Sequence, residues 1–237
     1  MKNEADTATI QFKGDGPLGS IVAVTDSKAH VRGYVVNPFV DLPLNGKGKL
    51  DVGGGIGKGT LSVVRDLGMK EPYVGQVPIV TGEIAEDMTY YFASSEQIPT
   101  AIGLGVLVGT DNKAICAGGF MLQLMPEATE EMAAKLEERM HTVEPVTTLL
   151  EKGMTPEDIL FYLTEGFDMM MENKGIEPAY ECKCSRDRME KALISIGKQE
   201  LEDLIREQGE AELTCQFCDR KYLFNKKELE SLYERAK

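Results

Sequence analysis

Four of the five cysteines in this 237-residue chain form two close pairs near its C-terminal end. The pairs are Cys182-Lys183-Cys184 and Cys215-Gln216-Phe217-Cys218. Paired thiols at such spacings are typical of a metal site. Zinc suits them, because each pair can place two thiolates on one tetrahedral ion and both pairs together leave no open position for a substrate water. The only histidines, His30 and His141, lie far from the pairs in the sequence, so we expect four sulfur ligands and no nitrogen.

Two other kinds of cysteine site fit these spacings less well. Permanent disulfides require an oxidising compartment, whereas cytosolic thiols stay reduced. A thioredoxin-like site would place Cys215 and Cys218 at the start of a helix, but the flanking runs 211–214 and 222–224 are strand-like, as in the turn of a zinc ribbon. The fifth cysteine, Cys116, stands alone in an apolar run and is interpreted as a buried small hydrophobe.

Two glycine-rich motifs resemble phosphate-binding loops only superficially. Residues 14–19 satisfy the dinucleotide pattern, but a strand-like run follows where that motif requires a helix. Residues 53–60 mimic a P-loop, yet Gly59 stands where the motif requires Ser or Thr. No Ser-His-Asp set or convincing carboxylate pair accompanies them, so we expect no catalytic residues and no enzyme activity.

Composition and charge narrow the classes of protein further. The chain has 42% hydrophobic and 27% charged residues, which is typical of a globular protein. Its formal charge of -13 argues against a nucleic-acid partner, because phosphate neutralisation requires clustered Lys and Arg. No apolar run is long enough to cross a membrane, and residues 1–9 lack the hydrophobic segment of a secretory signal. We therefore expect a cytoplasmic protein without membrane contact.

The elements that must position the cysteines differ on the two sides of Pro126. The first part holds 19 of the 24 glycines and alternates turns with β-branched and apolar runs, which predicts a mainly antiparallel sheet. The expected strands are Ile21–Thr25, Val31–Val36, Leu61–Val64, Val74–Thr81, Met88–Ala93, Gly103–Val108 and Ala114–Leu124.

Beyond Pro126 the apolar residues recur with a helical period. Helices are expected over 129–143, from Thr155 as N-cap to about Glu165, before Gly197, before Gly209, and after the capping-box pair Asn225 and Glu228. The stretch 166–181 breaks this period and is interpreted as a linker. The fold class expected is α+β, with a mainly antiparallel sheet core domain, a helical linker and a small C-terminal zinc-binding domain.

The paired cysteines and four further sequence runs closely resemble the 33-kDa heat-shock protein family of redox-regulated chaperones. The runs are GDGPLGSIVAV (14–24), GTLSVVRDLG (59–68), YYFASSEQIP (90–99) and AGGFMLQLMP (117–126). The resemblance spans nearly the whole chain. It implies an ATP-independent holdase with a β-rich core domain (1–126), a metastable helical linker (127–178) and a zinc-binding redox-switch domain (179–237).

Carried over to this chain, the resemblance assigns roles to individual residues. Cys182, Cys184, Cys215 and Cys218 are expected to bind one zinc ion when reduced and to form disulfides when oxidised, with release of the metal. The partners implied are unfolded or misfolded client proteins and a second copy of the chain in a homodimer on activation. Met169, Met170 and Met171 are candidates for client contact, with ordinary helix packing as an equally good interpretation.

The chain departs from the family in one respect, and two rival functions stay open. Its mass is 26.1 kDa, so we expect the family's N-terminal segment, a first strand and a helix of the core, to be absent before Met1 and to leave an open sheet edge. A zinc-ribbon nucleic-acid-binding or assembly factor would bind RNA or DNA in a salt-dependent way. A thiol oxidoreductase would turn over a disulfide substrate.

Overall fold

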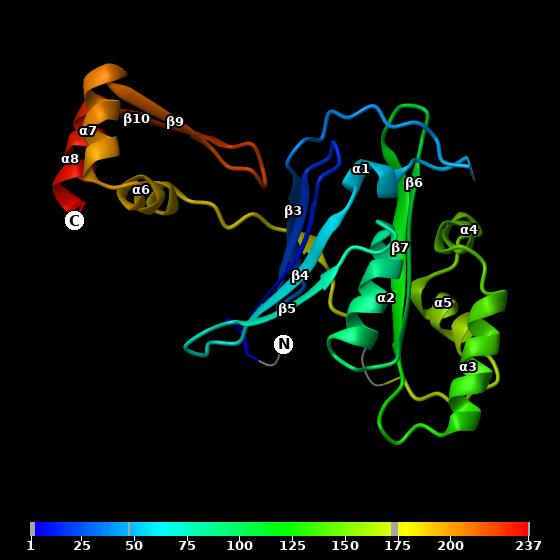
Figure 1. Cartoon of the computed structure of the whole chain (residues 1–237). Helices are drawn as coiled ribbons and strands as arrows, with labels where there is room; N and C mark the ends of the chain where they lie inside the picture. The colour runs from blue at the N-terminus through cyan, green and yellow to red at the C-terminus, as the bar shows by residue number, and fades with distance from the viewer. Residues whose placement is uncertain (1–2, 47, 172–174, 237) are drawn as a thin grey trace.

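The computed structural model describes residues 3–46, 48–171 and 175–236. Figure 1 shows a large sheet, a long ribbon with helices beside it, and a C-terminal module that projects from the side of the sheet. The α+β class with antiparallel sheets agrees with the prediction. Among the helices in the described part of the chain, none has the length and apolar composition needed to cross a bilayer.

The large sheet has the strand order β5-β4-β1-β2-β3-β8. Its strands are β1 (Thr7–Gly14), β2 (Ser20–Asp26), β3 (His30–Val35), β4 (Gly59–Asp66), β5 (Tyr73–Pro78) and β8 (Ala179–Tyr180). All neighbours are antiparallel except β3 and β8. Phe12 of β1 lies opposite Ile21 and Leu61 and is buried with Leu61 in the core. The expected strands at 21–25, 31–36 and 61–64 are confirmed, and the one expected at 74–81 is present but ends at Pro78. Strands β1 and β8 were not predicted.

Helix α2 (Ile84–Ser94) packs against β5 and β6 (Thr100–Val108). The strand predicted over Met88–Ala93 is therefore wrong. Met88 and Tyr91 face the same buried cluster as Phe12 and Leu61, and this helical period overrides the strand propensity of the Tyr-Tyr-Phe run. The helix also buries Asp87, whose carboxylate accepts hydrogen bonds from the N–H groups of residues 80–82 and so fixes the preceding loop.

The ribbon pairs β6 with β7 (Ala114–Gln123), and helix α4 (Val146–Glu151) covers one of its faces. Both strands were predicted from the sequence, but their separation from the large sheet was not. Gly105 and Gly118 lie opposite each other at this crossing. A Cβ at Gly105 would lie 2.9 Å from Thr147 and one at Gly118 would lie 3.0 Å from Leu150. Glycine at both positions therefore leaves room for the helix to approach the ribbon closely.

Helices α3 (Glu130–Thr142) and α5 (Pro156–Leu163) complete the helical region after Pro126. The capping box at the start of α5 is confirmed, with Thr155 and Asp158 bonded reciprocally. Arg139 of α3 donates hydrogen bonds to the Tyr162 carbonyl near the end of α5, where unpaired carbonyls attract cations. Leu149, Ile159 and Leu163 form a core cluster against β7. Helix α4 was not predicted.

The C-terminal module has a hydrophobic cluster of its own, built around Leu201, Phe224 and Leu229. Its elements are α6 (Arg186–Ser195), α7 (Lys198–Glu207), β9 (Glu210–Thr214), β10 (Lys221–Asn225) and α8 (Lys226–Arg235). The predicted helices are confirmed, as are their ends near Gly197 and Gly209, which both have positive φ. The capping box of Asn225 with Glu228 is also present.

Candidate metal centre

The four paired cysteines come together in space. Their Sγ atoms all lie within 4.8 Å of one another. Sulfurs that surround a zinc ion tetrahedrally at about 2.3 Å are separated by about 3.8 Å. The Cys182–Cys215 and Cys184–Cys218 sulfurs are 3.6 and 3.5 Å apart. The size and the softness of this donor set therefore fit a tetrahedral zinc ion.

Each pair is held by backbone structure that leaves its side chains free for a metal. Cys182 and Cys184 lie in an extended segment between β8 and Ser185, the N-cap of α6. Cys215 and Cys218 lie in the turn between β9 and β10, where the N–H groups of Cys218 and Asp219 donate to the Cys215 carbonyl. The strand–turn–strand setting is the zinc-ribbon geometry expected for the second pair, and it contains no helix start of the thioredoxin kind.

The surroundings of the thiols differ in polarity. Burial raises the pKa of the Cys182 thiol to about 12. The hydroxyl of Tyr222 donates a 3.1 Å hydrogen bond to Cys184 Sγ and lowers the pKa of that thiol to about 7. In this arrangement Cys184 is thus the thiol that most readily becomes a thiolate, the form that binds metal and reacts with oxidants.

The remaining residues singled out in the sequence lie elsewhere. Cys116 is in β7 and is half-buried rather than buried, outside the thiol cluster. His30 Nδ1 contacts the carboxylates of Asp26 and Glu181 rather than a sulfur. The described cluster of potential metal ligands contains neither His30 nor His141.

The three consecutive methionines lie outside the helices of the described chain. Met169 accepts a hydrogen bond from the Thr164 hydroxyl at its sulfur. The side chains of Met170 and Met171 are exposed, Met170 by 86%. Packing inside a helix therefore does not account for this run.

The two glycine motifs contact each other. Amides of residues 15, 16 and 18 donate to carbonyls of residues 58, 56 and 55. A Cβ at Gly14 would lie 1.8 Å from the Ile56 carbonyl oxygen, so the glycines permit the two backbones to cross. The sequence prediction of a tight turn over 14–19 is confirmed, and α1 (Val52–Ile56) occupies the other motif.

The sequence is similar to known proteins of one family. The family model described as Hsp33 protein matches residues 1–225. The chain belongs to the Hsp33 family. A 33 kDa chaperonin of Caldanaerobacter subterraneus subsp. tengcongensis is 50% identical over the whole chain, which covers 80% of that relative, and one of Bacillus subtilis is 47% identical over 98% of the chain and 79% of the relative.

A solved structure has the same fold. The crystal structure of a 33 kDa chaperonin from Thermotoga maritima superposes with a TM-score of 0.88 at 42% identity, covering 98% of this chain and 79% of that one. The resemblance read from the sequence runs is thereby confirmed. Hsp33 is a chaperone family, so unfolded protein binding and a stress-response role belong to this chain's family, and the four-cysteine cluster fits a zinc-binding redox centre.

Proposed function

We propose that this protein is a redox-regulated, ATP-independent holdase that binds unfolded clients under oxidative stress. The observation that supports the proposal most strongly is the cluster of four thiols, which come from the segment between β8 and α6 and from the turn between β9 and β10. Such a cluster reacts with oxidants, and its loss of bound metal would affect the folding of the module that carries it.

In the reduced state, Cys182, Cys184, Cys215 and Cys218 hold one zinc ion as thiolates. The metal supplies structural cross-linking between the two pairs and no catalysis, because a four-thiolate site has no open position. Much of its binding free energy becomes folding free energy of the module, since no preformed site exists in an unfolded chain.

Oxidation converts the four thiolates into two disulfides. For each disulfide, two thiolates lose two electrons to one hydrogen peroxide, which takes up two protons and leaves as two waters. Because a disulfide sulfur is a poor ligand, the oxidised cysteines would no longer hold a zinc ion, and the ion would be released without a change of its own charge. Reduction reverses the chemistry, so the site can act as a switch.

The proposal also assigns the domains, the client-binding segment and a surface for dimer formation. We divide the chain into a core domain (1–126), a linker (127–178) and a switch domain (179–237), and we assign client contact to the linker with Met169, Met170 and Met171, whose flexible side chains adapt to varied surfaces. Leu104, Val106 and Met121 form an exposed apolar face on the ribbon, which supports a homodimer on activation. Reduced thiols are maintained in the cytoplasm, where we place the protein.

The test is suppression of the aggregation of a chemically denatured client. We expect little suppression by reduced, zinc-loaded protein and strong suppression after peroxide treatment. Serine at all four ligand positions should make the activity the same with and without peroxide, whereas Cys116→Ser should leave the switch intact. The proposal is wrong if the four-serine variant still responds to peroxide, or if the unmodified protein suppresses aggregation in neither state.

A further inference from the structure

One residue within each cysteine pair contacts the core sheet. Lys183 lies between Cys182 and Cys184, and its Nζ is 2.5 Å from Asp26 Oδ2 at the end of β2. Phe217 lies between Cys215 and Cys218, and its ring packs on Tyr34 of β3. The same short segments that position the thiols therefore also connect the module to the edge of the sheet.

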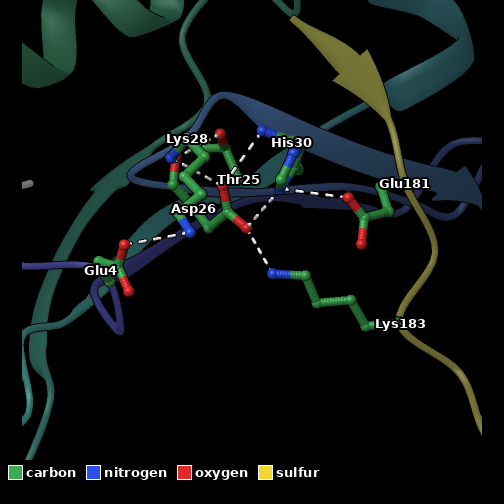
Figure 2. A network of polar contacts seen from close by, with 7 residues as sticks. All are labelled: Glu4, Thr25, Asp26, Lys28, His30, Glu181 and Lys183. Carbon is green, nitrogen blue, oxygen red and sulfur yellow. Dashed lines mark hydrogen bonds and ion pairs between the residues drawn. The ribbon is translucent and has the colours of Figure 1, made fainter.

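Asp26 is the centre of the contact with Lys183 (Figure 2). Its side chain is only 8% exposed, and Oδ1 accepts hydrogen bonds from the backbone N–H groups of Lys28 and His30. Oδ2 faces His30 Nδ1 and Lys183 Nζ. The hydrogen bond from Lys183 holds the pKa of this carboxyl well below its usual range. A buried carboxylate of this kind depends on its cationic partner, because its burial costs free energy otherwise.

A second connection joins the segment before Cys182 to the outer edge of β3. The N–H groups of Ala179 and Glu181 donate to the carbonyls of Ala29 and Val31 at 3.2 and 3.0 Å. The Glu181 carboxylate lies 3.2 Å from His30 Nδ1, and Figure 2 shows the two side chains facing each other. Since both carboxylates near that nitrogen are acceptors, Nδ1 carries the hydrogen. Backbone pairing and side-chain charge thus both hold the segment before Cys182 against the edge of β3.

The ring of Phe217 completes the contact from the other cysteine pair. Its centroid is 5.0 Å from that of Tyr34 in an edge-to-face arrangement, and the guanidinium of Arg32 lies 5.1 Å from it. The hydroxyl of Tyr180 is within hydrogen-bonding reach of the Gly33 and Phe217 carbonyls. Tyr180 therefore joins the strand edge to the turn that carries Cys215 and Cys218.

We propose that Lys183 and Phe217, anchored by Asp26 and the β3 edge, form a docking interface that transmits the coordination state of the thiols to the core sheet. The inference rests on the proposed redox switch and names the contacts through which the switch acts on the core sheet. A metal held by both pairs fixes the backbone around each enclosed residue. When the sulfurs are rearranged into disulfides, Lys183 and Phe217 leave their positions on the sheet, and the edge of β3 becomes free to pair with other extended chains.

The interface can be tested in the full chain, reduced and zinc-loaded, without oxidant or client. Asp26→Asn keeps the Oδ1 acceptor of the turn and removes the charge, and Lys183→Met keeps the length of the stem and removes the ammonium. Each should accelerate amide exchange at Ala179 and Glu181 about tenfold while the zinc content stays at one per chain. The double variant should exceed either single one by much less than the product of their effects, because both remove one contact.

Lys28→Met is the matched control. Lys28 belongs to the same turn, but its ammonium pairs with Glu4 at 3.1 Å and not with Asp26, so exchange at Ala179 and Glu181 should not change. Three results would contradict the proposed interface. They are unchanged amide exchange at Ala179 and Glu181 in Lys183→Met, loss of zinc from that variant, and multiplicative effects on exchange in the double variant.

Activation by oxidant gives a second and separable readout. Lys183→Met should reach half-maximal suppression of client aggregation at a lower peroxide dose than the unmodified chain, and an equal or higher dose would contradict the proposed route. If no form of the protein suppresses aggregation, the proposed function fails, but accelerated exchange with zinc retained would still establish the interface.

Discussion

Replacing Leu229 by alanine should weaken zinc binding although this side chain is not one of the candidate metal ligands. Leu229 lies on α8, is fully buried, and packs in the cluster that joins α6, α7, α8 and the hairpin of β9 and β10. The module is small, and a core of this size supplies at most about 3–5 kcal/mol of folding free energy. We therefore expect the module to be folded only when the metal is bound.

The size of the effect follows from this linkage. A buried Leu→Ala substitution costs about 2–5 kcal/mol, and we take about 3 kcal/mol for this site. If the metal-free module is unfolded, the whole cost appears in the zinc dissociation constant, which should rise about 150-fold. If the metal-free module were folded, both forms would lose the same stability and the dissociation constant would not move.

The assay is competition for zinc with a chromophoric chelator of known affinity, on reduced protein at fixed pH. Leu61→Ala is the control, because Leu61 is equally buried but belongs to the core sheet. It should lower the stability of the core and leave zinc affinity unchanged. A Leu229→Ala protein that binds zinc within about threefold of the unmodified chain would refute the linkage between metal binding and folding of the module.

Three further predictions concern single contacts. Thr155→Ala removes the capping box of α5 and should cost about 1 kcal/mol, seen as about fivefold faster amide exchange over residues 156–163, with zinc retained. In reduced protein, Tyr222→Phe removes the hydrogen bond from the phenol to Cys184 Sγ in the folded module, so the zinc dissociation constant should rise about tenfold, whereas Tyr233→Phe should not change it. Asp87→Asn should lower the stability of the core domain by about 2 kcal/mol in thermal unfolding, because the amide places a donor against the N–H groups of residues 80–82, and zinc affinity should not change.

The elements with strong local signals could be predicted from the sequence. Thr155 and Asn225 begin helices because each is followed three residues later by a carboxylate that completes a capping box. Glycines 197 and 209 follow helices because they take positive φ at low cost. The spacing of the cysteine pairs likewise predicted that four sulfurs would meet, and the structure brings them together.

Features that depend on distant partners could not be predicted in this way. The run Met88–Ala93 has strand propensity, but it forms a helix because Met88 and Tyr91 complete a core supplied by other parts of the chain. Strand β8 has only two residues and exists through its pairing with β3. The contact of Lys183 with Asp26 spans 157 residues, and nothing in the local pattern of either residue indicates it.

The central claim, that the thiol cluster controls chaperone activity through the metal, is tested most directly by one time course. Reduced, zinc-loaded protein is treated with peroxide, and samples are taken for released zinc, measured with a chromophoric chelator, and for suppression of client aggregation. We predict that both rise together and that reductant with zinc returns both to their starting values. Activity that appears while zinc stays bound, or complete zinc release without any gain in activity, would contradict the claim.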